Sequence, residues 1–308
     1  MQMELGIVRP AVFQRRYLAR RILDITLDPS TSIQREHVGA VNTIDIEEAE
    51  GRYLLSGGGD GNIHVYDLED SERKERRIIK TASADPRIRL CDLKSGAFTH
   101  SLSGHRGTVL SVDWSPRHEY LLASGSTDTT VRLWDIRKSA ACLCSLDLHN
   151  SNSPPLSEAN SAHTRTVNGV MFTPDGLHLV TTGHDDKMRL WDLYTGQNTL
   201  ANYGTMIRNQ FVSNLTPLIS PMSMGSPTFV FHPSDDRSIL MFDLMDGSLV
   251  KRLTGSYGRV TALAWRPRTQ EIYSAGNDHD ILVWAPKSVD HENALKAIAD
   301  QDTWSDSD

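Results

Sequence analysis

Internal repetition constrains this chain more than any other feature of its sequence. One short unit occurs four times, and its copies, which align without gaps, occupy residues 57–67, 125–135, 182–192 and 275–284. Each copy has an Asp six residues before its aromatic residue and a hydroxyl ten residues before it, which gives Asp60, Asp128, Asp185 and Asp278, and Ser56, Ser124, Thr181 and Ser274. Fixed offsets of this kind predict the same local geometry in every copy.

Each unit predicts a β-hairpin preceded by one more strand. Two short alternating segments flank a turn rich in Gly, Asp and Asn, as at 53–56 and 63–66. A third apolar segment lies upstream in each copy, at 41–46, 109–114, 167–172 and 260–265. Four residues before its first Val stands His37, His105 or His163, and the last copy has Ser256 there.

Gly-His near the start of a unit and Trp-Asp near its end resemble the WD-repeat family. Gly104-His105, Trp134-Asp135 and Trp191-Asp192 carry this resemblance, and it covers residues 36–286. It implies an all-β propeller whose blades have four strands each. It also implies a structural hydrogen-bond network in each blade, formed here by Ser56, Asp60, His105, Ser124, Asp128, Trp134, His163, Thr181, Asp185, Trp191, Ser274, Asp278 and Trp284.

Two further copies are incomplete. One ends at Phe242-Asp243 and has His232 at the hydroxyl position, so we interpret it as a degenerate blade. The other, at 85–92, continues into 98–102 and lacks its first two strands. Only 25 residues separate Tyr66 from Cys91, too few for a whole unit. We therefore predict five full repeats plus one partial, and an internally shortened ring, such as a splice form, with the junction in 69–84.

The segment 21–27 alternates like a strand, and the last repeat ends at Trp284-Ala285-Pro286 without a fourth strand. We expect the N-terminal segment to supply that strand and close the ring, because closure removes exposed sheet edges.

A His, a hydroxyl and an Asp together could suggest a hydrolase triad. Their recurrence in the good repeats favours a structural role, so we predict no catalytic residue and a protein that is not an enzyme. The turn at 57–59 is interpreted as a hairpin rather than a phosphate loop. The three cysteines, Cys91, Cys142 and Cys144, provide no four-ligand zinc set. We expect no metal, no cofactor and a reducing compartment.

The net charge of −7 and the pI of about 5.9 disfavour direct binding to nucleic acid. No segment approaches the ~18 apolar residues needed to span a bilayer. Residues 1–21 lack the apolar core of a secretory signal. We therefore expect an intracellular protein without a membrane partner.

The residues Trp134-Asp135-Ile136-Arg137 resemble the Trp-Asp-x-Arg box of WD-repeat substrate receptors. Such receptors dock on the damaged-DNA-binding adaptor of cullin-RING ubiquitin ligases, and the resemblance assigns the adaptor contact to Arg137. Residues 1–20 contain a basic amphipathic stretch that we interpret as an adaptor-docking helix. The expected adaptor-binding set is therefore Trp134, Asp135, Arg137, Phe13, Arg16 and Tyr17. A plain surface Arg and a frayed terminus are the alternatives.

Longer stretches, at 50–58, 90–96, 175–179 and 304–308, resemble the Cockayne syndrome group A family of WD-repeat proteins. That resemblance implies a substrate-recognition subunit of a cullin-RING E3 ubiquitin ligase acting in transcription-coupled nucleotide excision repair. It implies a nuclear location. The implied partners are the adaptor and the cullin-RING ligase, the group B Cockayne syndrome remodelling ATPase and the stalled RNA polymerase II complex.

The predicted organisation is a docking segment at 1–20, a propeller at 21–286 and an acidic flexible tail at 287–308. Two alternatives to the ligase receptor stay open. One is a generic WD-repeat scaffold for protein complexes, and the other is a non-functional or competing truncated form.

Overall fold

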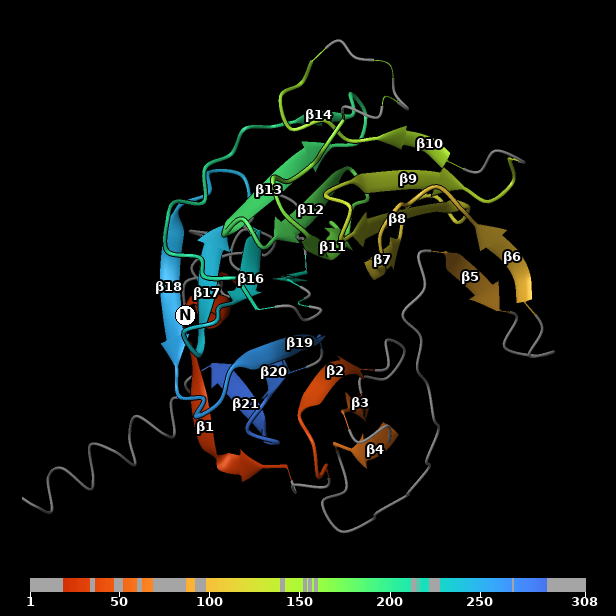
Figure 1. Cartoon of the computed structure of the whole chain (residues 1–308). Helices are drawn as coiled ribbons and strands as arrows, with labels where there is room; N and C mark the ends of the chain where they lie inside the picture. Colours follow the sequence, from red (N-terminus) through yellow and green to blue (C-terminus); the bar gives the residue numbers. More distant parts are fainter. Residues whose placement is uncertain are drawn as a thin grey trace, which may run out of the picture.

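The computed structural model shows an all-β propeller in which sheets are arranged around a central axis (Figure 1). The structure describes residues 19–33, 37–46, 52–59, 63–68, 87–91, 98–138, 142–151, 154, 157, 160–211, 215, 217–221, 228–267 and 269–286. Phe13, Arg16, Tyr17, Asp60 and the predicted tail at 287–308 lie outside these residues.

Three of the sheets have four consecutive strands each. The first consists of β7 (Val109–Trp114), β8 (Leu121–Ser126), β9 (Val131–Asp135) and β10 (Cys142–Ser145). The second consists of β11 (Val167–Phe172), β12 (His178–Gly183), β13 (Lys187–Asp192) and β14 (Gln197–Asn198). The third consists of β15 (Leu218–Ile219), β16 (Phe229–Pro233), β17 (Ser238–Asp243) and β18 (Leu249–Thr254).

The remaining sheets include both ends of the described chain. The strands β19 (Val260–Arg266), β20 (Glu271–Gly276) and β21 (Ile281–Pro286) form a sheet with β1 (Ile25–Ser32). A three-stranded sheet consists of β2 (Val41–Ile46), β3 (Tyr53–Gly58) and β4 (Ile63–Asp67). The strands β5 (Ile88–Cys91) and β6 (Phe98–Leu102) form a separate pair.

This arrangement confirms the predicted five full repeats plus one partial. Five sheets have three or four strands, and the partial repeat is the β5–β6 pair. The degenerate copy that ends at Phe242-Asp243 forms a complete four-stranded sheet. The first strand of each good repeat lies where it was predicted, and only β19 extends one residue further, to Arg266.

The N-terminal segment closes the last sheet, as expected. Strand β1 pairs antiparallel with β21, so that Ile25 lies opposite Pro286 and Leu27 lies opposite Trp284. The strand was predicted to begin at Arg21, which is incorrect, because residues 19–23 are helical and β1 begins at Ile25. Ala, Arg and Leu favour helix there. Ile22 and Ile25 are buried in the same core cluster.

The core lies between neighbouring sheets rather than within one sheet. Trp134, Trp191 and Trp284 are among the largest fully buried side chains. The inner strands β2, β7, β11, β15 and β19 line a central cavity of about 710 Å³. Within the described residues, no helix is long and apolar enough to cross a membrane. The described residues also contain no group of three or more His, Cys, Asp or Glu side chains that could hold a metal ion.

We predict that Ile25→Ala lowers the stability of the ring by about 2 to 5 kcal/mol, because it leaves a cavity beneath the closing strand. Leu23→Ala, at a side chain that is 40% exposed, is the matched control and should change stability by less than about 1 kcal/mol. Urea denaturation followed by tryptophan fluorescence measures both. Equal midpoints for the two variants would contradict a role of β1 in closure.

Candidate functional site

A buried hydrogen-bond network links loop, turn and strands in the β7–β10 sheet. The Nε2 atom of His105 lies 2.7 Å from the hydroxyl of Ser124, and its Nδ1 atom lies 3.0 Å from a carboxylate oxygen of Asp128. The indole N–H of Trp134 donates to the same Ser124 hydroxyl at 2.8 Å. One hydroxyl therefore connects the two buried rings of the blade.

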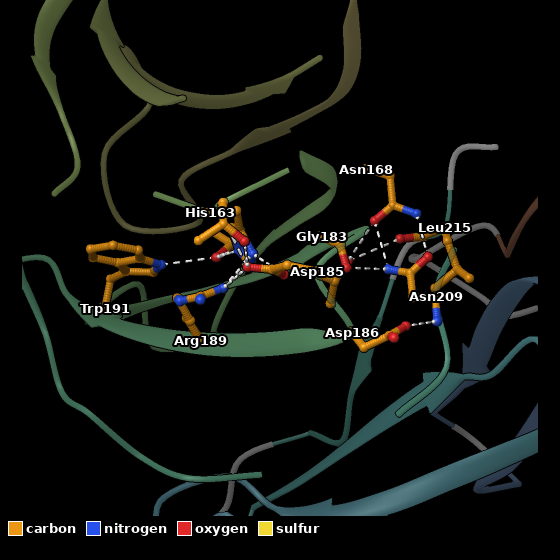
Figure 2. Close-up of polar contacts among 12 residues, drawn as sticks. His163, Asn168, Gly183, Asp185, Asp186, Arg189, Trp191, Asn209 and Leu215 are labelled. Carbon is orange, nitrogen blue, oxygen red and sulfur yellow. Dashed lines mark hydrogen bonds and ion pairs between the residues drawn. The ribbon is translucent and has the colours of Figure 1, made fainter. Parts of the chain in front are cut away.

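The β11–β14 sheet repeats this geometry (Figure 2). His163 lies 2.8 Å from the Thr181 hydroxyl through Nε2 and 2.9 Å from Asp185 through Nδ1. The indole N–H of Trp191 donates to Thr181 at 2.9 Å. Arg189 adds an ion pair with Asp185 at 2.9 Å. Because the same set serves two successive sheets, its role is to fix the packing of each blade.

The other networks are partial. In the last repeat the indole N–H of Trp284 donates to Ser274 at 2.8 Å, and Asp278 accepts from the backbone N–H of Gly258 at 2.9 Å, without a His. In the first repeat His37 lies 2.7 Å from the Ser56 hydroxyl, and Tyr66 stands where the other repeats have Trp.

The degenerate blade keeps only the Asp of the network, Asp236, which accepts from the Ser238 hydroxyl at 2.6 Å. His232 is fully buried on β16, and neither of its ring nitrogens has a hydrogen-bond partner among the described residues. Phe242 takes the place of the Trp and offers no N–H. Burial lowers the pKa of His232 to about 4, so the ring is neutral at physiological pH.

The Asp side chains of the two full networks are held ionised. Burial raises the pKa of Asp128, but hydrogen bonds from His105, from Thr130 and from a backbone N–H outweigh burial and bring the pKa well below its usual range. The pKa of Asp185 is lowered in the same way, because its contacts with His163 and Arg189 outweigh burial. Burial lowers the pKa of His163, although Asp185 opposes this change.

These networks are poorly suited to nucleophilic catalysis. The side chain of Ser124 is fully buried, and its hydroxyl is already engaged by His105 and Trp134. A triad nucleophile must reach a substrate carbonyl. The geometry therefore assigns Ser124, and likewise Thr181, a structural role.

Arg137 is presented at the surface in the turn that follows β9. Its guanidinium makes two parallel hydrogen bonds with the Asp135 carboxylate, from Nε at 3.0 Å and from a terminal nitrogen at 2.8 Å. The guanidinium also lies 4.6 Å from the centre of the Tyr120 ring. The Arg137 side chain is nevertheless 62% exposed. Paired in this way, the guanidinium is held in one orientation while its outer edge stays accessible.

The other two predicted contact residues of this box have different positions. Trp134 has no exposed surface, and Asp135 is buried and bonded to Arg137. The Arg137 hydrogen bond is the largest cause that lowers the pKa of Asp135 to about 2. We therefore correct the assignment of Trp134 as a surface contact, because it can affect docking only by packing the blade beneath Arg137. Asp135 positions the guanidinium.

A shallow pocket of about 650 Å³ surrounds Arg137. The turn between β7 and β8 forms most of its wall, with Ser115, Pro116, Arg117, His118, Glu119, Tyr120, Leu121, Asp135 and Arg137 as lining residues. Sequence reasoning missed Tyr120, whose ring lies against the Arg137 guanidinium at the edge of this pocket. Because the two residues belong to different turns, no spacing rule in one repeat connects them.

A second polar pair was also missed. Asn168 and Asn209 exchange two side-chain hydrogen bonds of 2.8 and 2.9 Å, and Asn209 also donates to the carbonyl of Gly183 at 3.1 Å (Figure 2). Both residues are completely buried. Since 41 residues separate them, only the fold brings them together.

The family comparison identifies the repeat. The family model described as WD domain, G-beta repeat matches residues 29–67, 96–135, 156–192 and 247–285, about half of the chain. This chain belongs to the WD-repeat family. Members of this family are typically non-enzymatic scaffolds for other proteins.

Individual relatives of this WD-repeat protein are distant in sequence. It is 26% identical to WD repeat-containing protein ATCSA-1 of Arabidopsis thaliana, with 98% of each chain covered. It is 25% identical to nuclear distribution protein PAC1 of Arthroderma benhamiae, over 67% of this chain and 56% of that protein. It is 25% identical to human striatin-4, over 92% of this chain and 33% of that protein.

The alignment with ATCSA-1 also bears on the expected internal shortening. It spans 449 positions, whereas this WD-repeat protein has 308 residues. The plant relative therefore has stretches with no counterpart here.

We predict that Ser124→Ala destabilises the protein by about 3 kcal/mol, because it leaves both His105 and Trp134 without their buried partner. Ser274→Ala is the matched control, since it removes the partner of Trp284 in a blade without the His, and should cost about half as much. Urea midpoints measure both changes. A larger loss for the Ser274 variant would argue against the shared hydroxyl.

We predict that His232→Leu makes the protein less sensitive to acid. The neutral folded ring has a pKa of about 4, below the ordinary value of 6.5, so the unfolded chain binds the proton first as pH falls. The contribution of neutral His232 to the free energy of unfolding is fully present above pH 6.5 and declines as the pH falls toward 4. Between pH 7.5 and pH 5 the wild type should lose about 2 kcal/mol more than the variant. Equal losses in paired urea titrations would refute this assignment.

Proposed function

We propose that this WD-repeat protein is a substrate-recognition subunit of a cullin-RING E3 ubiquitin ligase that acts in transcription-coupled nucleotide excision repair. The observation that carries the proposal is the exposed, pre-oriented guanidinium of Arg137 within the sequence Trp134-Asp135-Ile136-Arg137. In this proposal Arg137 docks the damaged-DNA-binding adaptor.

The geometry of Arg137 is suitable for such a contact. Two hydrogen bonds to Asp135 and the stacked Tyr120 ring reduce the freedom that a long side chain loses on binding. The exposed edge of the guanidinium can still donate to a partner carbonyl or carboxylate. A rigid, partly exposed Arg above a shallow pocket has the properties of an interface anchor.

Two sequence relationships support the cellular role. Four stretches resemble the Cockayne syndrome group A family, and the similarity to the plant protein named ATCSA-1 extends over nearly the whole chain. On this basis we propose a nuclear location. The proposed partners are the adaptor and cullin, the group B remodelling ATPase and stalled RNA polymerase II.

The shortened ring gives this proposal a specific form. Arg137, Asp135 and Tyr120 all lie in the β7–β10 sheet or its turns, whereas the expected junction at 69–84 lies before β5. Surfaces that a longer relative builds across several blades would be reduced, but the adaptor contact would remain. The alternative to an active receptor is therefore a chain that retains adaptor docking and competes with longer receptors.

A generic WD-repeat scaffold is the second candidate function. The similarity to human striatin-4 and to PAC1, at almost the same identity as to ATCSA-1, favours it. In that case Arg137 is an ordinary surface residue, and loss of its side chain should leave every complex unchanged.

We predict that Arg137→Ala weakens binding to the purified damaged-DNA-binding adaptor at least about tenfold, because a central interface Arg is commonly worth 2 kcal/mol or more. Asp135→Asn, which keeps the shape and weakens the orientation of Arg137, should produce a smaller loss. Arg106→Ala, at an exposed Arg in another loop, is the matched control. Size-exclusion co-elution and a titration of labelled adaptor measure the effects.

A variant lacking residues 1–17 tests the proposed docking segment in the same assay and should also bind more weakly. If the full chain is monodisperse but does not bind the adaptor, the scaffold function is favoured instead. Ubiquitylation activity equal to that of a longer receptor, in reconstituted reactions, would contradict the competitor role.

A further inference from the structure

Two sheet faces next to the shortened region lack the packing that the other blades show. We call the side of a sheet that packs against the next sheet along the chain its following face, and the opposite side its preceding face. The following face of the β2–β4 sheet consists of Leu55, Ile63 and Val65, and the preceding face of the β7–β10 sheet includes Val112 and Trp114. Each face consists of apolar side chains at positions that other blades bury against a neighbouring sheet.

The register of the strands identifies the following face. Leu55 lies opposite Val65, just as Ala123 lies opposite Leu133, Val180 opposite Leu190 and Tyr273 opposite Val283. The counterparts Ala123, Val180 and Tyr273 are at most 2% exposed, whereas Leu55 is 38% exposed. Ile63 and Val65 are only half-buried, although their counterparts in the other sheets are buried.

The same comparison identifies the preceding face. Val112 lies opposite Ser124 and corresponds to Ile44, Val170 and Leu263, which lie opposite the network hydroxyls of their own sheets. Those three counterparts are at most 7% exposed, whereas Val112 is 42% exposed. Trp114 is 44% exposed, although its counterparts Ile46 and Phe172 are buried.

The β5–β6 pair covers only part of the preceding face. Ile88 and Leu102 pack against Leu122 and Trp134, which belong to the middle strands β8 and β9. Val112 and Trp114, on the inner strand β7, are left exposed. In Figure 1 the β2–β4 sheet and the β5–β6 pair lie at separate positions around the ring.

The two free faces belong to opposite sides of one interface that the chain uses four times, and on the preceding side the β5–β6 pair already covers Leu122 and Trp134. The following face of each intact sheet packs on the preceding face of the next, as shown by the core clusters that join β7–β10 to β11–β14, β11–β14 to β15–β18, β15–β18 to the closing sheet, and the closing sheet to β2–β4. Among the described residues, no such cluster joins β2–β4 to β7–β10. The surface that best fits either face is therefore the other one.

We propose that a second copy of this chain docks here, with the following face of one copy packed against the preceding face of its partner. The contact continues the blade-to-blade interface from one molecule into the next. It joins two different faces, so an assembly of any length still has one free face of each kind, at its two ends, and can bind another copy. Association should therefore extend beyond two chains as the concentration rises.

Sedimentation velocity over a concentration series tests this proposal with two single variants. Leu55→Lys blocks the following face and Trp114→Lys blocks the preceding face, each at an exposed position. Each variant alone should stay monomeric at concentrations where the wild type associates. Tyr194→Lys, at a side chain that is 96% exposed outside both faces, should associate like the wild type.

Mixing the two variants decides the geometry. Trp114→Lys retains a free following face and Leu55→Lys retains a free preceding face, so an equimolar mixture should form a complex of two chains and nothing larger. A wild type that is monomeric at all concentrations, association that survives either substitution, or a mixture that stays monomeric would overturn the proposal. If either variant loses the wild-type circular dichroism spectrum, Leu55→Gln and Val112→Lys provide a second pair.

Discussion

The structure depends on apolar packing between successive sheets, because no sheet here can bury both of its faces alone. A β-sheet with two apolar faces needs a neighbour on each side, and a ring supplies both neighbours without leaving a terminal blade. Strand β1 makes this possible at the last sheet, where it pairs with β21 and places the fully buried Ile25 between sheets. The same requirement is not met between β2–β4 and β7–β10, where Leu55 and Trp114 lie at the surface.

The hydrogen-bond networks add specificity to this packing rather than create it. The β15–β18 sheet has a buried His232 and Phe242 where the network hydroxyl and Trp would stand, yet it keeps four paired strands and a continuous core. Burial of the apolar side chains Phe231, Met241 and Phe242 stabilises this blade. In the blades that keep Trp134 or Trp191, the hydroxyl between His and Trp instead fixes one relative position of loop and strands.

The sequence predicted the features that depend on repeated local patterns. The inner strands and the Trp-to-hydroxyl pairs recur at fixed offsets, so the pattern of one repeat predicts the same structure in the others. The start of β1 was mispredicted because residues 21–27 fit the alternating pattern of a strand. Ile22 and Ile25 are three residues apart and both buried, a spacing that also fits one face of a helix. Tyr120 beside Arg137, and Asn168 beside Asn209, depend on contacts between separate turns or blades that no repeat pattern encodes.

A loss of blades would affect Arg137 and the free faces in opposite ways, for one physical reason. Asp135 and Tyr120 hold Arg137 from within a single sheet, so its orientation requires only that this sheet remain folded. The packing of Leu55 and Val112 requires a neighbouring blade, and their exposure shows that no blade covers them. A propeller that lost blades would therefore keep any contact confined to one blade. Each surface shared between two blades would instead become exposed and available to bind another protein.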